Sequence, residues 1–451
     1  MPQKGAKDAK TNVYDRLVLR LIPIFFILAI SFILPLGAEA GIELQYEYSR
    51  INSAASEEVV NKWNKDKNFR KKLEAEGWTV VKARGENFYL AKSEIISSRE
   101  QLDAAMGGPN KTDAQKKVAE IYDFTTTNQE FKNDLNVRGT MNSAAYEGSK
   151  KSRDGDQIMR VQLFDTTNLT DISEEQLARD FTPWGGITVM MSTAHSRSWP
   201  MVNEVSIFVH EFSHTLDSNS LAYDQAALGK DLIHFQNEIT TESNALTEAW
   251  GEYQQIHYFP SEKLSWSGEG LKNFANTVKI ERKNGGYDLL HLDAIPSTGT
   301  YYIPGEGNRL VKPSDLLKIE SVNLDFLLRL YSAIDQKYGQ GKGRQLILDV
   351  FSTLNRKKVT GKERTLQLMI NQLLLDRVAE FPELPAIVSG ILQEATSGKL
   401  TKEQLGNFFA LAKKDPRIKF PEAGLPSAHS APPVKVEKVE TTQASDNPYS
   451  E

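Results

Sequence analysis

Alternating apolar and polar residues predict a small β-sheet in the first half of the chain. The segments Gln157–Phe164 and Ile187–Met191 alternate as half-buried strands do. Two shorter segments, Trp78–Lys82 and Asn87–Ala91, flank a polar turn at residues 84–86. This arrangement predicts a β-hairpin.

Apolar residues at helical spacing occupy much of the rest of the chain. Early in the chain they predict helices at Ser56–Glu76, Arg99–Ala105 and Asp113–Tyr122. Later they predict a series of further helices at Leu324–Tyr338, Arg344–Leu354, Thr365–Leu375, Ala386–Glu394 and Lys402–Lys413. A few strands among so many helices indicate an α+β fold.

The elements divide the chain into four parts. Residues 1–40 form an N-terminal targeting segment, and residues 41–154 form a small α/β accessory domain without a chemical motif. Residues 155–420 form the main domain, whose C-terminal part is helical. Residues 421–451 are rich in proline, serine and threonine, so we expect a disordered tail.

The N-terminal segment has the order of an export signal. Basic residues precede an apolar run at 21–36, and Ala38-Glu39-Ala40 has the small-x-small form of a cleavage site. The alternative is an uncleaved anchor, although the run is short against the roughly 20 residues of a membrane span. We expect an exported protein, periplasmic or extracellular, that contacts a membrane only if this segment stays uncleaved.

Composition limits the kinds of partner, nucleophile and metal site that the chain can have. The chain has 451 residues and a net charge of −5, which gives no indication of a nucleic-acid partner. It contains no cysteine, which excludes disulfides, cysteine nucleophiles and metal sites built on thiolates. A metal would therefore need nitrogen and oxygen ligands, and histidine is scarce at seven residues.

A helix predicted to begin at Asn203, a suitable N-cap, carries the clearest chemical motif. His210 and His214 are four residues apart, which places both imidazoles on one helix face where they can bind one metal ion. Glu211 is next to His210 and is the candidate general base for a metal-activated water. The other face is apolar at helical spacing: Val205, Phe208, Phe212 and Leu216.

A catalytic zinc site takes three protein ligands and keeps one position open. The compact metzincin arrangement is absent, because Asp217 and Ser220 stand where it has a glycine and a third histidine. A second predicted helix offers Glu248, with Glu252 one turn further along the same face. Glu248 is therefore the candidate third ligand. Glu252 and Asp217 are candidates for contacts that orient the ligand imidazoles.

These segments resemble a known group of enzymes. Residues 210–217 have the form His-Glu-Phe-x-His-x-x-Asp, and residues 246–253 read Leu-Thr-Glu-Ala-Trp-Gly-Glu-Tyr. Together they resemble the gluzincin metallopeptidases, and more narrowly the group of anthrax lethal factor and Mlc titration factor. The resemblance implies one zinc ion per chain on His210, His214 and Glu248, with Glu211 as general base.

The resemblance is good over about residues 155–260, general as far as about 415, and absent over 41–150. It implies a zincin-like fold: a small mixed sheet, an active-site helix and a C-terminal helical subdomain. Ile187–Met191 would be the edge strand beside the cleft, where an extended peptide can pair with it.

The function we expect is that of an exported zinc endopeptidase acting on a peptide or protein substrate. Two alternatives stay open: a catalytically silent binding protein on the same fold, and a metal-dependent hydrolase of a non-peptide bond. Should Glu248 not bind the metal, Glu242 and Glu238 are the next candidates.

The residue that would stabilise the oxyanion is not evident. The lethal factor pattern has a tyrosine one to two turns before the ligand glutamate, and Thr241 and its neighbours offer none. Several aromatic residues and histidines are candidates for this role, each with a structural role as the alternative: His195, His257, His291, Tyr253, Tyr287, Tyr301 and Tyr302.

Overall fold

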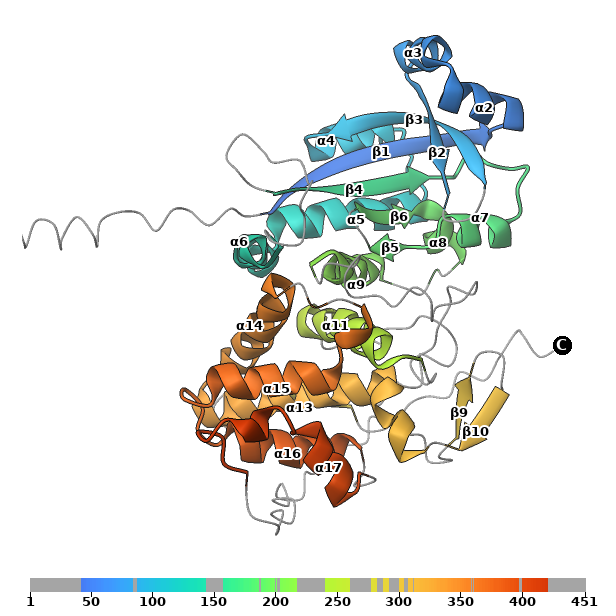
Figure 1. Cartoon of the computed structure of the whole chain (residues 1–451). Coiled ribbons are helices and arrows are strands. Elements are labelled where there is room, and N and C mark those ends of the chain that lie inside the picture. Colours follow the sequence, from blue (N-terminus) through green and yellow to red (C-terminus); the bar gives the residue numbers. More distant parts are fainter. Residues whose placement is uncertain are drawn as a thin grey trace, which may run out of the picture. The chain divides into compact units, whose positions relative to one another are not determined.

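The chain is an α+β protein with a small mixed sheet and many helices (Figure 1). The computed structural model describes residues 42–83, 87–142, 157–185, 188–198, 200, 203–216, 240–259, 277–281, 287–291, 300–303, 307–310, 312–357, 359, 361–396 and 400–420. Two compact units divide the chain. The first contains residues 1–223, 254–266 and 351–361, and the second contains the remainder.

The first unit contains a six-stranded sheet in the order β2-β3-β1-β4-β6-β5. The strands are β1 (Ile42–Ala54), β2 (Trp78–Lys82), β3 (Phe88–Ile96), β4 (Gln157–Asp165), β5 (Trp184–Gly185) and β6 (Thr188–Ser192). The pairs β1–β4 and β4–β6 are parallel, and the other neighbours are antiparallel. The hairpin predicted from the sequence is confirmed as β2 and β3.

The helices of the first unit connect these strands. They are α2 (Glu57–Lys65), α3 (Lys67–Ala75), α4 (Arg99–Ala105), α5 (Asp113–Thr127), α6 (Gln129–Asn142), α7 (Glu174–Asp180), α8 (Thr193–Ser198) and α9 (Glu204–Leu216). The single helix predicted at Ser56–Glu76 is two helices. Asp66 separates them because its side chain accepts the backbone N–H groups of Asn68 and Phe69 and so caps α3.

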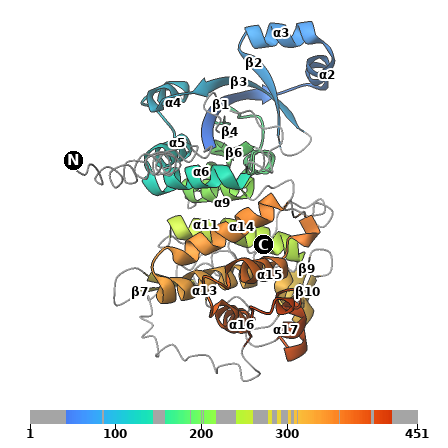
Figure 2. The same ribbon diagram turned by 60° about the vertical axis from the view of Figure 1, so that its left-hand side comes forward.

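One face of the sheet forms the main core of this unit. Tyr46 of β1, Val161 of β4 and Met191 of β6 are buried there against helices that include α5 and α9. Figures 1 and 2 show these two helices along the same side of the sheet. The sheet therefore supports α9 along the face that carries the apolar residues.

The second unit is mainly helical. Its helices are η1 (Pro313–Lys318), α13 (Glu320–Tyr338), α15 (Leu366–Arg377), α16 (Leu384–Ala395), α17 (Lys402–Phe408) and η3 (Ala412–Lys414). It also contains two two-stranded sheets. One pairs β7 (Thr277–Glu281) with β8 (Tyr287–His291), and the other pairs β9 (Thr300–Ile303) with β10 (Gly307–Leu310). Helix α13 is its centre, with nearly every residue from Glu320 to Ile334 buried.

Three elements contain residues of both units. Helices α11 (Glu242–Tyr258) and α14 (Lys342–Arg356) and the short turn η2 (Gly361–Glu363) each contribute residues to both. The boundary in α11 falls between Tyr253 and Gln254.

The domain boundary predicted after residue 154 needs correction. Strand β1 comes from the predicted accessory domain and β4 from the predicted main domain, yet they pair in parallel from Ile42 with Gln157 to Arg50 with Asp165. A parallel pair joins strands that are distant in sequence, so it leaves no signal in local patterning. Residues 42–142 and the strands β4 to β6 belong to one unit.

The predicted edge strand also needs correction. Strand β6, which corresponds to the predicted Ile187–Met191, is the second strand from the edge. The two-residue strand β5 pairs outside it, Trp184 with Met190 and Gly185 with Val189. A two-residue strand is too short for the alternation of side chains to reveal it.

No helix among the described residues is long and apolar enough to cross a membrane. The predicted export segment, residues 1–40, and the predicted tail, residues 421–451, lie outside the described residues. Their assignment stays a prediction.

Candidate metal centre

Helix α9 begins as its sequence predicts. The side-chain oxygen of Asn203 accepts the backbone N–H groups of Val205, at 3.0 Å, and Ser206, at 3.3 Å. These groups have no partner within the helix, so the asparagine supplies the hydrogen bonds that the first turn lacks. The predicted N-cap is confirmed.

The apolar face of α9 packs into the core of the first unit. Phe208 and Phe212 are completely buried and stacked, with ring centroids 5.7 Å apart. Phe131 of α6 lies against Phe212, with ring centroids 5.2 Å apart. Burying such side chains stabilises the fold by about 1.5–3 kcal/mol each. This packing holds α9 rigidly, so the residues on its other face have fixed positions.

That other face carries the histidine pair. The ring centroids of His210 and His214 are 4.6 Å apart, and their Nε2 atoms are 2.9 Å apart. Both side chains are almost fully buried. Two imidazole nitrogens on one tetrahedral zinc ion, each about 2.0–2.1 Å from it, lie roughly 3.3 Å apart. The observed pair is within a few tenths of an ångström of that separation.

Glu248 of helix α11 completes a group of three. One ligand atom from each of His210, His214 and Glu248 lies within 4.8 Å of the others, and all three residues are buried. This buried group can hold a metal ion. It is the group of three metal-ligating side chains found among the described residues, and it matches the three ligands chosen from the sequence.

Glu211 lies where the edge of the sheet meets α9. A Cβ atom at Gly185 of β5 would be 1.8 Å from the backbone carbonyl oxygen of Glu211. Only glycine allows the two backbones to approach this closely. The side chain of Glu211 is 7% exposed. The general base candidate therefore has a backbone that is held against β5 on one side.

A buried glutamine contacts the first histidine, and the sequence did not point to it. Oε1 of Gln255 is 3.2 Å from Nδ1 of His210, and Nε2 of Gln255 donates to Oγ of Ser206 at 3.2 Å. Gln255 lies two turns after Glu248 on α11, so both are on the same face of that helix. The available signal was this seven-residue spacing from the third ligand.

The structure shows the contacts of three of the alternative oxyanion candidates. Nδ1 of His195 is 2.9 Å from Oε1 of Glu204, and Nε2 of His257 is 2.6 Å from Oε1 of Glu130. Tyr253 packs against the ring of Trp250 in the interior. Burial raises the pKa of the Tyr253 hydroxyl well above its usual value.

Other residues named from the sequence are not placed. Asp217 and Glu238 lie outside the described residues. The backbones of strands β8 and β9 are described, but the side chains are not, so His291, Tyr287, Tyr301 and Tyr302 keep their status as candidates. Glu252 is buried one turn after Glu248, and its contact with a ligand imidazole stays a prediction.

Comparison with known proteins adds no relative: no protein-family model, no curated protein and no solved structure matches this chain.

The donor set fits a zinc ion better than a harder cation. Two imidazole nitrogens and one carboxylate oxygen are ligands that zinc accepts, whereas calcium and magnesium prefer oxygen ligands throughout. Glu248 and Glu252 are both buried within one turn of α11. Carboxylates in the interior are costly unless positive charge or hydrogen bonds offset them. A divalent cation on Glu248 would supply such charge.

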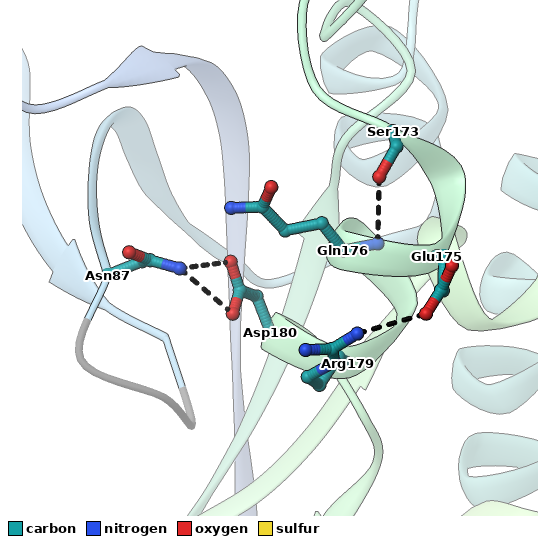
Figure 3. Close-up of a pocket in the computed structure, with 6 residues that line it drawn as sticks. All are labelled: Asn87, Ser173, Glu175, Gln176, Arg179 and Asp180. Atoms are coloured by element: carbon teal, nitrogen blue, oxygen red, sulfur yellow. Dashed lines mark hydrogen bonds and ion pairs between the residues drawn. The ribbon is translucent and has the colours of Figure 1, made fainter.

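A polar hollow of about 360 Å³ lies elsewhere, at helix α7 (Figure 3). The residues that line it are Asn87, Ser173, Glu175, Gln176, Arg179 and Asp180. Both oxygens of Asp180 accept from the Asn87 amide, and Arg179 pairs with Glu175 at 3.0 Å. None of the three candidate metal ligands lines this hollow, and its charged groups have partners: Arg179 pairs with Glu175, and Asp180 accepts from Asn87 and Tyr89. We assign it a structural role.

Proposed function

We propose that this protein is an exported zinc-dependent endopeptidase of zincin-like fold. The observation that carries the proposal is the buried group of His210, His214 and Glu248, with Glu211 beside His210 on the same helix. These ligands come from two helices, and their types and order are those of the gluzincin pattern. Zinc bound in such a site supplies a Lewis acid and an acidified water.

Each residue of the site would then have a separate role. His210, His214 and Glu248 bind the ion. Glu211 does not share the metal with them, because one residue along a helix turns the side chain by about 100°. Its carboxylate accepts a proton from the attacking water and returns it to the leaving amine.

Glu211→Gln tests the proposed chemistry. The amide keeps the shape of the side chain but cannot accept the proton, so zinc content is expected to match that of wild type. Hydrolysis of a generic peptide substrate is expected to fall by at least about 10²-fold. Metal analysis and a peptidase assay on the same preparations measure both quantities.

The outcome also separates the two alternatives. Wild-type activity in Glu211→Gln with zinc retained would overturn the mechanism. A wild-type protein that binds zinc but cleaves no peptide would favour a silent binding protein. Cleavage of an ester or another non-peptide bond, with no peptide cleavage, would favour the other hydrolase class.

A further inference from the structure

We propose that Gln255 is a positioning residue that holds His210 in the one tautomer able to bind the metal. The inference rests on the proposed metal site. It goes beyond that site by assigning a role to a residue that is neither a ligand nor a base. Gln255 and Ser206 are fully buried, so the hydrogen bonds between them and His210 are shielded from water.

The argument begins with the two nitrogens of His210. Nε2 faces Nε2 of His214, so Nε2 is the atom aimed at the metal position. A neutral imidazole carries its proton on one nitrogen only. To bind a metal through Nε2, His210 must carry that proton on Nδ1. The Nδ1–H group then needs an acceptor, and Oε1 of Gln255 is 3.2 Å away.

The orientation of the Gln255 amide decides which tautomer is stable. With Oε1 toward His210, the amide accepts from Nδ1–H and leaves the lone pair on Nε2. With the amide turned over, Nε2 of Gln255 would donate to Nδ1, and His210 would carry its proton on the metal side. An amide that can face either way therefore needs an anchor.

Ser206 is the partner at the other end of the amide. Its hydroxyl oxygen accepts from Nε2 of Gln255 at 3.2 Å while Oε1 faces His210. Because a hydroxyl can also donate, the orientation of the amide rests on both contacts together. Ser206 lies one turn before His210 on α9, so it sits on the same helix face. The three side chains form a chain of hydrogen bonds that begins and ends on α9 and passes through α11.

A neutral acceptor also suits the charge of the site. Glu211, Glu248 and Glu252 are all buried on α9 and α11. A further carboxylate at position 255 would add another negative charge to the interior, whereas an amide supplies the acceptor without it. Orientation of a ligand imidazole by an outer partner is typically worth 10- to 100-fold in metal affinity.

The test is zinc affinity, measured by competition with a chelator on metal-free full-length protein. Gln255→Leu removes the acceptor while keeping an apolar side chain of similar size, and its zinc affinity is expected to fall by about 10- to 100-fold. Gln255→Glu keeps an acceptor oxygen at this position. Its zinc affinity is therefore expected to exceed that of Gln255→Leu by about the same factor. Unchanged affinity in Gln255→Leu would overturn the proposal.

Gln254→Leu is the matched control. Gln254 is also fully buried on α11, but it is rotated by about 100° from Gln255 and belongs to another face. Both substitutions disturb the interior of the same helix, so both are expected to lower the melting temperature. Only Gln255→Leu is expected to lower zinc affinity. An equal loss in both variants would mean that Gln255 acts through stability alone, and the proposal would fail.

A second measurement needs neither a variant nor bound metal. Nitrogen NMR of the histidine rings in metal-free wild-type protein is expected to show His210 with its proton on Nδ1. A proton on Nε2 of His210 would overturn the proposal even if every variant failed to fold. A wild-type protein that binds zinc and shows this tautomer, but cleaves no peptide, would contradict the proposed function and leave the role of Gln255 intact.

Discussion

At the scale of single residues, Glu248 is the ligand whose assignment can be checked most directly. Glu248→Ala removes an oxygen ligand from a group of three, so the loss of zinc affinity is expected to exceed the roughly 10- to 100-fold that follows loss of an outer partner. Elemental analysis after dialysis measures it. Glu242→Ala, on the first residue of the same helix, is the control and should keep one zinc per chain.

The opposite result has a clear meaning. Full zinc retention in Glu248→Ala together with loss in Glu242→Ala would transfer the third ligand to Glu242. Retention in both variants would leave Glu238 as the remaining candidate named from the sequence.

Glu242 itself has a predictable pH dependence. Burial raises the pKa of its carboxyl above the usual value, and Lys318 acts in the opposite direction. An acid whose pKa is raised on folding opposes folding when charged, so this cost is absent at low pH and complete above the folded pKa. Glu242→Gln removes the cost. Relative to wild type, the variant's free energy of unfolding should therefore increase as the pH rises from about 4, near the ordinary pKa of the unfolded carboxyl, through the raised pKa of the folded protein.

Denaturant unfolding in excess chelator, at several pH values, measures this difference without a contribution from metal binding. A difference between Glu242→Gln and wild type that stays constant over the whole range would show that the carboxyl has an ordinary pKa in the folded protein.

At the scale of elements, the contact between strand β5 and helix α9 is the tightest packing constraint near the candidate metal centre. Gly185→Ala would place a methyl group 1.8 Å from the Glu211 carbonyl oxygen, and neither backbone can rotate out of the way. One of the two elements must shift. We expect a loss of about 1–3 kcal/mol in stability, as for overpacked interiors, together with reduced peptidase activity.

Gly390→Ala is the comparison for this substitution. Gly390 lies within α16, and a Cβ atom there would meet no atom within 4 Å. Alanine in a helix interior is favoured over glycine by about 0.5–1 kcal/mol, so this variant should be slightly more stable. Wild-type stability and activity in Gly185→Ala would show that the close approach of β5 to α9 does not exist in solution.

Most elements with strong local signals were predicted well, with one clear exception. Helix α4 was predicted with its observed bounds, and the helices at Leu324–Tyr338 and Arg344–Leu354 were confirmed within a few residues as α13 and α14. Strand β1 was missed although its sequence carries the signal of a half-buried strand, because apolar and polar residues alternate from Ile42 to Ser49.

At the scale of the whole molecule, the export signal gives a prediction that the described residues do not address. We expect the N-terminal segment to be removed after Ala40, because the basic, apolar and small-x-small order is that of a cleaved signal. N-terminal sequencing of protein from its native compartment should then begin at Gly41. An intact Met1 in a membrane fraction would establish an anchor and contradict cleavage.

The sequence by itself determined the chemistry of the candidate centre. The spacing of His210 and His214 on one helix places their imidazoles together, because helix geometry relates residues four apart without any help from the rest of the chain. The α+β class followed in the same way from local periodicity. Glu248 needed one further step, since its choice combined its place on a second predicted helix with a resemblance to a known group of enzymes.

The tertiary structure alone decided how the parts combine. It joined β1 to β4, placed β5 outside β6, and brought Gln255 to His210. Each of these contacts links residues that are distant in sequence, and each depends on how buried side chains pack together rather than on the periodicity of any one segment. Local patterns specify elements and the residues that share a face, whereas packing specifies which faces meet.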